Sequence, residues 1–370
     1  MKVDAHYYSV LGFARASGFD KDTAQKIAYA SQFVDDAKIN YLTVRGDLPD
    51  GTTSDRVNEE NCFFNMATCH TYTRIKTFNY SAMIHNTSAF HFVPGAEGPC
   101  FVRKMRCREN SPICEKIMDA ALQKDDPIFL GLVLHPFADT FSHQGFSGLL
   151  SKVNDIDDCK ILNKSGRGLD QLLLSAREVR DGFYKMMDFV MPAYGHGQAM
   201  SFPDLPYLKW SYVYDYTDEF SGLYRSSGVI DNPGRFRTAF EKIREYLQNY
   251  LQKNPQYRDS KVAGNGFEPL FKALVAKKSD EGRIRNWQKV LVGNGLFEQG
   301  DPALKYDKDL WLREAFDDFD RKRFHQRQVI GAKIAPGFIN SCWYRFYSAV
   351  KWYKELFFEN CIAHGLTIQR

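Results

Sequence analysis

The stretch PIFLGLVLHPFADTFSHQGFSG, residues 127–148, decides the fold and carries the first sign of chemistry. Apolar residues lie on almost every side of the helix that this stretch predicts. That pattern is typical of a helix buried inside a larger protein rather than on its surface. Asp125 or Asp126 can cap the free amides at the start of the helix, and Pro127 suits its first turn.

Three potential metal ligands interrupt the apolar run: His135, Asp139 and His143. Residues four apart share one face of an α-helix, so these side chains can converge on one point or on two neighbouring points. A carboxylate without a partner is costly in apolar surroundings, so we expect Asp139 to be protonated, ion-paired or bound to a metal. Pro136 removes one backbone hydrogen bond and predicts a bend near His135.

The bulk composition bounds the class of protein. The chain has 370 residues, of which 44% are hydrophobic and 25% are charged, as is usual for a globular protein with one large core or two domains. A net charge of +4 is too small to indicate nucleic-acid binding by itself. We recognise no signal peptide and no apolar run of about 18 residues. We therefore expect a cytoplasmic protein without a transmembrane helix and with reduced cysteines, export by a leaderless route being the alternative.

A second helix predicts a further ligand. After Asp20, a suitable cap, small and apolar residues recur at helical spacing and extend as a stripe to Asp35. Asp35 stands where that stripe predicts an apolar residue, whereas Asp36 points about 100° away. Asp35 is therefore the better candidate.

Later histidines and one aspartate complete the candidates. His91 stands in the segment FHFVPG, while His70 and His85 lie in polar surroundings that predict surface positions. Glycines on both sides of His196 allow close approach to a ligand. Asp204 lies between two prolines, which exclude a regular helix across this part of the chain.

Several of these segments resemble one family. Residues 129–139, FLGLVLHPFAD, resemble the FLGLxLHxxxD helix of bacterial zinc-dependent phospholipase C, a helical family that includes secreted single-strand-specific nucleases. FHFVPG is similar to its HFYDP-type segment. Asp4 and His6 are similar in position to its NSHLW-type opening, in which a histidine and the free N-terminal amine hold zinc. Met1 replaces the family's terminal Trp, which makes Asp4 a candidate to replace the amine. The resemblance covers about residues 1–205.

The resemblance implies a fold and a reaction. The fold would be all-α, a multi-helix bundle with a metal-binding helical domain over 1–208 and a helical C-terminal region over 209–370 packed on it. The reaction would be metal-dependent hydrolysis of phosphodiester bonds, with two or three zinc ions or another first-row divalent metal. Asp139 and Asp35 are the predicted catalytic residues, with Asp139 bridging two ions. The full predicted ligand set is His6, Asp35, His91, His135, Asp139, His143, His196 and Asp204.

Other interpretations stay open. The substrate can be a lipid, a nucleotide or a nucleic acid. The alternatives are a cytosolic nucleotide phosphohydrolase and a non-enzymatic, metal-stabilised binding protein.

The remainder of the chain predicts further helices and one loop. Residues 45–60 are rich in turn formers and predict a loop. Amphipathic helices are predicted over 166–192, after Asn232, and over 267–277, 280–292, 309–326 and 338–361. The last of these mixes aromatic residues with Lys and Arg. We expect it to pack into an aromatic core, the alternative being contact with a membrane surface.

Overall fold

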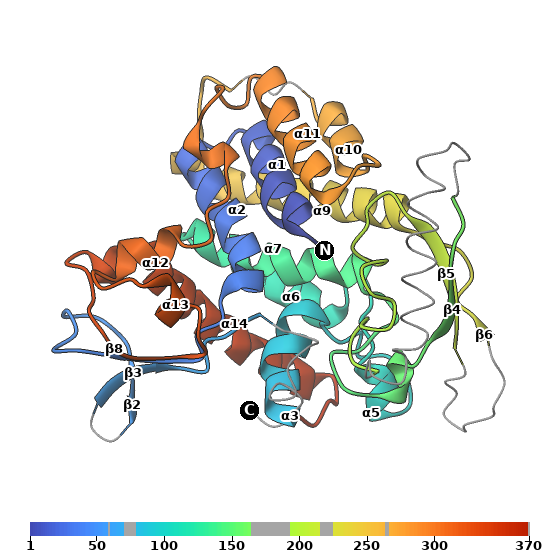
Figure 1. The fold of residues 1–370 in the computed structure, drawn as a ribbon, viewed down its shortest axis with the longest axis horizontal. Coiled ribbons are helices and arrows are strands. Elements are labelled where there is room, and N and C mark those ends of the chain that lie inside the picture. Colours follow the sequence, from blue (N-terminus) through green and yellow to red (C-terminus); the bar gives the residue numbers. More distant parts are fainter. Residues whose placement is uncertain (58–59, 70–78, 164–192, 215–224, 263–265, 369–370) are drawn as a thin grey trace.

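In the computed structural model, the helix at the centre of the sequence is also the centre of the fold. The structure describes residues 1–57, 60–69, 79–163, 193–214, 225–262 and 266–368. Helix α7 (Pro127–Ser142) packs against α2, α6, α9 and α14 (Figure 1). All of its residues except Phe129 are buried, which confirms the prediction of an internal helix. Asp126 caps it, Pro127 occupies its first turn, and the helix continues through Pro136.

The helices around α7 come from the whole length of the chain. From the first half they are the π-helical turn η1 (Asp4–Ser9), α1 (Val10–Ser17), α2 (Lys21–Asp36), α3 (Tyr80–Ala82), the π-helical turn η3 (Met83–Ser88), α4 (Ala89–His91), α5 (Phe101–Lys104) and α6 (Pro112–Ala121). From the second half they are α9 (Asn232–Lys253), α10 (Glu268–Leu274), α11 (Asp280–Gly293), α12 (Leu310–Ala315), α13 (Arg321–Phe324) and α14 (Cys342–Ala363). One hydrophobic core contains residues of both halves. The division into two domains stays a prediction.

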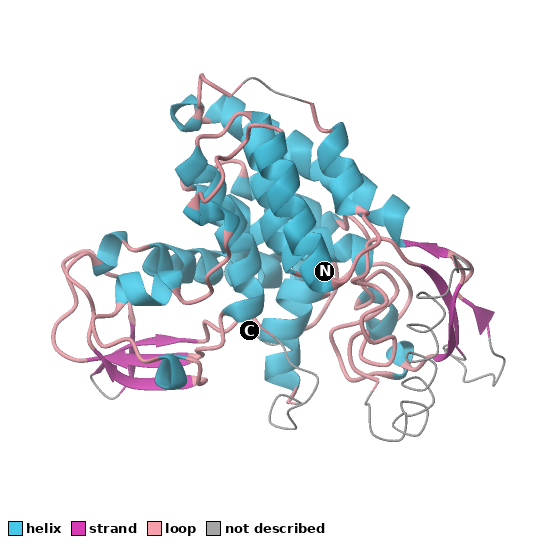
Figure 2. Ribbon diagram, turned by 45° about the horizontal axis from the view of Figure 1, so that its top comes forward, coloured by secondary structure: helices cyan, strands magenta, loops and turns pink. Residues whose placement is uncertain are grey.

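The all-α prediction is wrong, because the described residues contain two four-stranded sheets at opposite sides of the helices (Figure 2). The first has the order β2 (Asp55–Val57), β3 (Glu60–Phe64), β1 (Tyr41–Val44), β8 (Gln328–Ala332). The second consists of β4 (Asp157–Ile161), β5 (Lys209–Tyr214), β6 (Arg225–Ser226) and β7 (Ile230–Asp231), the last two both pairing with β5. The protein is therefore a mixed α and β protein.

The two halves of the chain meet in the first sheet. Strand β1 pairs antiparallel with β3, placing Leu42 opposite Phe63, and parallel with β8, placing Leu42 opposite Val329. This pairing could not be read from any local pattern. It also corrects two predictions, since β2 and the start of β3 lie within the stretch predicted as a loop, and the helix predicted over 309–326 is two short helices, α12 and α13, followed by β8.

The close approach of α2 to α7 depends on Gly131. A Cβ atom at Gly131 would lie 2.3 Å from the carbonyl oxygen of Ile27 and 2.8 Å from the Cβ of Ala30. Only glycine leaves room for the two backbones to touch in this way. The contact brings the last turn of α2, with Asp35, beside the half of α7 that carries His135 and Asp139.

The C-terminal helix α14 packs into the aromatic core, as predicted. Trp343, Phe346, Tyr347, Tyr353 and Phe357 are all buried. Helices α9, α10 and α11 agree with three further predictions. The helix predicted over 166–192 lies outside the described residues. No helix among the described residues is both long enough and apolar enough to cross a bilayer.

Candidate metal centre

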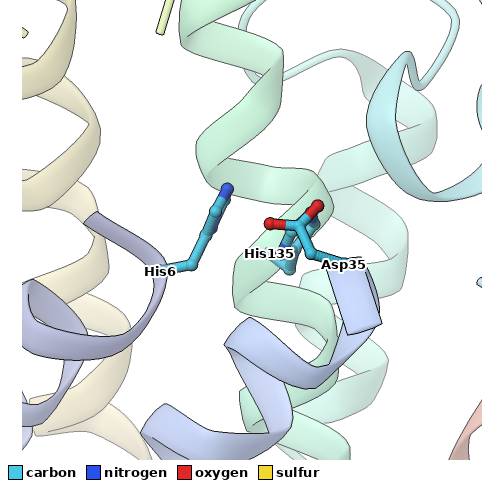
Figure 3. A group of neighbouring side chains, drawn as sticks. All are labelled: His6, Asp35 and His135. Carbon is cyan, nitrogen blue, oxygen red and sulfur yellow. The ribbon is translucent and has the colours of Figure 1, made fainter. Parts of the chain in front are cut away.

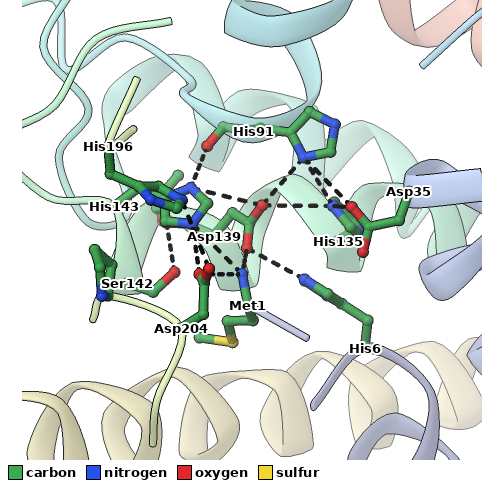
Figure 4. Close-up of polar contacts among 12 residues, drawn as sticks. Met1, His6, Asp35, His91, His135, Asp139, Ser142, His143, His196 and Asp204 are labelled. Atoms are coloured by element: carbon green, nitrogen blue, oxygen red, sulfur yellow. Dashed lines mark hydrogen bonds and ion pairs between the residues drawn. The ribbon is translucent and has the colours of Figure 1, made fainter. Parts of the chain in front are cut away.

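The structure brings all eight predicted ligands into one cluster (Figure 4). They come from separate elements: His135 and Asp139 from α7, His143 directly after it, Asp35 from α2, His6 from η1, His91 from α4, and His196 and Asp204 from the turns before β5. Three groups have ligand atoms within 4.8 Å of one another, and the first two share His135: His6, Asp35 and His135; His91, His135 and Asp139; and His143, His196 and Asp204.

Asp139 is the centre of the cluster. Its Oδ1 lies 3.2 Å from Nε2 of His6, and its Oδ2 lies 3.4 Å from both Nδ1 of His91 and Nε2 of His135. The carboxylate of Asp35 faces the same two imidazoles, with Oδ1 at 3.8 Å from His91 and 3.7 Å from His135. Figure 3 shows His6 and Asp35 directed from two different elements toward the His135 region of α7.

The other end of the cluster is built around Asp204. Its Oδ1 lies 3.1 Å from Nε2 of His143, and its Oδ2 lies 3.7 Å from Nε2 of His196. Buried Asn232, at the start of α9, positions the turn that carries Asp204, because its amide donates to the carbonyls of Phe202 and Leu205. The ring of His143 also stacks on Phe92, with 4.7 Å between ring centroids.

Backbone carbonyls hold four of the five imidazoles. His135 donates from Nδ1 to Ser31, and His143 donates from Nδ1 to His91, each over 2.7 Å. In the same way, the carbonyl of Met200 accepts from His196 Nδ1, and that of Thr68 accepts from His91 Nε2. In each ring, the nitrogen engaged in this way leaves the other nitrogen facing the cluster. This is how metal-binding histidines are usually fixed in tautomer and orientation.

His6 provides the test of whether a metal fits. The side chain is buried, and among the described residues neither ring nitrogen makes a hydrogen bond of regular geometry, although Nε2 lies 3.2 Å from Asp139 Oδ1. Its ring stacks on that of His135 with 3.7 Å between centroids, which leaves Nε2 directed at Asp139. A buried polar atom without a hydrogen bond is costly, and coordination of a cation by Nε2 would remove that cost. Nitrogen and carboxylate ligands without cysteine suit zinc and other first-row divalent metals.

A positive charge already lies between the carboxylates. The buried α-amine of Met1 is 2.6 Å from Oδ1 of Asp139 and 3.1 Å from Oδ1 of Asp204. Asp4 does not take the place of the amine, because it pairs instead with Arg283, whose Nε donates to Asp4 Oδ2 over 2.6 Å. That expectation was therefore wrong.

The electrostatics of the cluster favour metal-ligating forms of the side chains. Burial lowers the pKa of His6 to about 3 and that of His196 to about 4. Burial alone would raise the pKa of Asp139, but His143 and the Met1 amine outweigh it and hold that pKa well below its ordinary value. Neutral imidazoles beside an ionised carboxylate are the forms that bind a metal.

The cluster is open to solvent at its edges. The side chain of Asp35 is 31% exposed and that of Asp204 is 13% exposed, whereas Asp139 and His135 are shielded. Among the described residues, the carboxylates of Asp35 and Asp204 are thus the ligand groups nearest to solvent, while Asp139 and His135 lie inside.

Other neighbours of the cluster were not predicted, and one histidine was misplaced. Tyr306 donates to Asp36 over 2.8 Å and so fixes the residue next to Asp35, although 270 positions separate the two. No sequence signal joins such distant residues.

His85, predicted at the surface, is buried against Asn65 and Phe358. His70 lies outside the described residues.

The comparison with known families gives one match. Residues 1–361 match the model of DUF6765, a family of unknown function. The chain belongs to the DUF6765 family. No curated protein matches it, and no solved structure matches it. The family's description assigns no role to the His and Asp cluster of this DUF6765 protein.

Proposed function

We propose that this protein is a metal-dependent hydrolase of phosphodiester bonds. The observation that carries the proposal is the convergence of five imidazoles and three carboxylates in one cluster, with four of the imidazoles oriented by backbone carbonyls. Such an arrangement is expensive to bury unless cations fill it.

The ligand groups suggest how the cations would be shared. His6, Asp35, His91, His135 and Asp139 would hold one or two divalent ions, zinc being our first expectation. His143, His196 and Asp204 would hold another. Cations bound in this way lower the pKa of water from 15.7 to about 7 and so supply a nucleophile at neutral pH.

The chain's own residues would do the remaining work. Asp139 contacts ligands of both ends of the cluster and would set their separation. The carbonyls of Ser31, His91, Thr68 and Met200 keep the imidazoles in place without rearrangement during turnover. Asp35, at the exposed edge, lies where a substrate would enter. We therefore propose Asp139 and Asp35 as the residues whose loss most reduces activity.

An open edge favours a catalytic centre over a structural one. Structural zinc sites are closed by four protein ligands, while catalytic sites keep a position for water or substrate. The exposure of Asp35 agrees with the second kind of site. The choice of a phosphodiester rests on the resemblance of residues 129–139 to the phospholipase C helix. The buried rings of α14 give no support to a membrane-contacting face there.

Elemental analysis and a substrate pair test this proposal. We expect the purified protein to contain two or three first-row divalent ions and to hydrolyse bis(p-nitrophenyl) phosphate faster than p-nitrophenyl phosphate. Asp139→Asn should lose bound metal and at least about 100-fold in activity. His364→Gln is the matched control, since the His364 side chain bonds only to the end of its own helix in the described structure.

Three results would separate the alternatives. A monoester or nucleotide preference would favour a nucleotide phosphohydrolase. Bound metal with no turnover and no exchangeable water would favour a metal-stabilised binding protein. A metal-free protein with the same activity in Asp139→Asn as in the wild type would refute the metal centre itself.

A further inference from the structure

A second candidate site lies behind the turn that follows His143. A cavity of about 500 Å³ is formed where α5, the segment after it, the turn after α7, β5 and the start of α9 meet. Its polar and charged lining includes Glu97, Arg103, Arg106, Arg108, Glu109, Gln144, Tyr212, Tyr214 and Arg235. None of these residues is a predicted metal ligand.

The cavity has more cationic than anionic groups. Four arginines line it against two glutamates. Both glutamates are engaged at the surface, since Glu97 pairs with Arg108 and Glu109 accepts a hydrogen bond from Gln144 over 2.8 Å. Within the described part of the chain, neither Arg106 nor Arg235 forms an ion pair with a carboxylate.

One of these arginines is held in position. Arg106 donates from Nε to the carbonyl oxygen of Gly145 over 2.9 Å, which leaves the other guanidinium nitrogens for a ligand. Gly145 has a φ of +92°, and a Cβ there would lie 3.3 Å from Arg106 Nη2 and 3.2 Å from Tyr212 Oη. The guanidinium and the phenol therefore flank the same small space, which a side chain at position 145 would fill.

Arg235, on α9, lines the same cavity as Tyr212 and Arg106. Burial raises the pKa of Tyr212, while the positive charges of Arg106 and Arg235 both act to lower that pKa. Two guanidiniums and a hydroxyl thus face the cavity from three elements of the fold. Planar guanidinium groups match phosphate oxygens in pairs of hydrogen bonds, and a phenol can add a third donor.

We propose that this cavity binds a small phosphorylated organic molecule, at a site separate from the metal centre. The cavity is much larger than inorganic phosphate needs and has the size of ordinary small-molecule pockets. The phosphate would lie against Arg106, Arg235 and Tyr212, and the organic part would occupy the remaining space beside Tyr214. This proposal does not depend on the proposed hydrolase activity.

Calorimetric titration of the full-length protein tests it. The probes are AMP, ribose 5-phosphate and adenosine, at low ionic strength and with the protein as purified, without added metal. We expect AMP and ribose 5-phosphate to bind and adenosine not to bind. Equal affinity for AMP and ribose 5-phosphate would show that the cavity recognises the phosphate and the sugar. Tighter binding of AMP would show that the cavity also contacts the base. Both results support the site.

Matched arginine variants locate the binding. Arg235→Gln should weaken AMP binding at least about 10-fold, the usual effect of losing a hydrogen bond to a charged group. Arg235→Lys, which keeps the charge but not the paired donors, should weaken it less. Arg237→Gln, two positions along α9 but exposed and paired with Glu241, should leave it unchanged. Thermal unfolding without ligand checks that each variant is folded.

Several results would overturn the proposal. These are no binding of either phosphate tighter than about 1 mM, equal binding of AMP and adenosine, or wild-type affinity in a folded Arg235→Gln. Loss of AMP binding in Asp139→Asn with retention in Arg235→Gln would place the phosphate at the metal centre and would also overturn it.

Discussion

Replacing Gly131 by alanine tests whether the packing of α2 on α7 positions the proposed metal ligands. The new Cβ would lie 2.3 Å from the Ile27 carbonyl oxygen, roughly 1 Å short of an ordinary contact. A backbone carbonyl cannot rotate away as a side chain can, so the two helices must separate. Because Asp35 is on α2 while His135 and Asp139 are on α7, the separation is transmitted to the cluster.

The expected magnitudes follow from two opposing effects. Overpacking of a close contact typically costs about 1–3 kcal/mol, and a backbone clash belongs at the upper end of that range. Alanine recovers about 1 kcal/mol of helix propensity relative to glycine. We therefore expect Gly131→Ala to lower the free energy of unfolding by about 2 kcal/mol. Moving the ligand atoms by more than about 0.5 Å from their positions in the cluster should also weaken metal binding by about 10-fold or more.

Two measurements and one control examine this reasoning. Denaturant unfolding gives the stability, and competition with a chromogenic chelator gives the metal affinity. Gly293→Ala is the control, because no atom lies within 4 Å of the place that a Cβ would take there. It should leave metal affinity unchanged and raise the free energy of unfolding by at most about 1 kcal/mol, since it adds helix propensity without a clash. Unchanged stability in Gly131→Ala would refute the packing argument. Lower stability with full metal affinity would refute the link between helix contact and cluster.

Three further predictions concern stability. Removing metal with a chelator should lower the unfolding temperature, and restoring zinc should raise it again. The bound metal should add about 2.7 kcal/mol to the free energy of unfolding when free metal is 100 times the dissociation constant. A chelator without effect in differential scanning calorimetry would speak against a resident metal. Arg283→Met should lower the free energy of unfolding, measured with denaturant, by about 3–5 kcal/mol, because it leaves the buried Asp4 carboxylate without its partner. Adding Asp4→Asn should recover part of this loss. Equal stability of the single and double variants would contradict the prediction. Burial lowers the pKa of Lys354 from 10.5 to about 7. Between these values the unfolded chain binds more protons, so wild-type stability should rise with pH, by up to about 1.4 kcal/mol per unit, relative to Lys354→Met. Lys351→Met, which changes a half-exposed lysine on the same helix, should show the wild-type slope in the same unfolding series.

Local sequence patterns predicted the central helix and identified candidate ligands on it and on the second helix. The apolar run of residues 127–142, a cap at Asp125 or Asp126 and the stripe leading to Asp35 are all short-range features; the structure shows the buried helix, the cap at Asp126 and the buried stripe of α2. A polar residue on an apolar face is a strong signal because burial makes it costly. This is why Asp35, His135 and Asp139 could be selected from sequence.

The rest of the structure depends on contacts between distant residues. Strand β8 pairs with β1 across almost the whole chain, and Tyr306 fixes Asp36. The carbonyls that orient the histidines belong to residues such as Ser31 and Thr68, whose side chains carry no sign of that role. Backbone groups are the same in every residue, so their part in a site becomes visible only in three dimensions.

The pairing of Asp4 with Arg283 has a consequence for biosynthesis. The turn that presents His6 is anchored by a residue 279 positions later, so a nascent chain that has released all eight ligands from the ribosome still lacks this anchor. For the metal centre proposed above, we expect the site to be complete only after synthesis has passed α11, so that an unfinished chain would not bind cations too early.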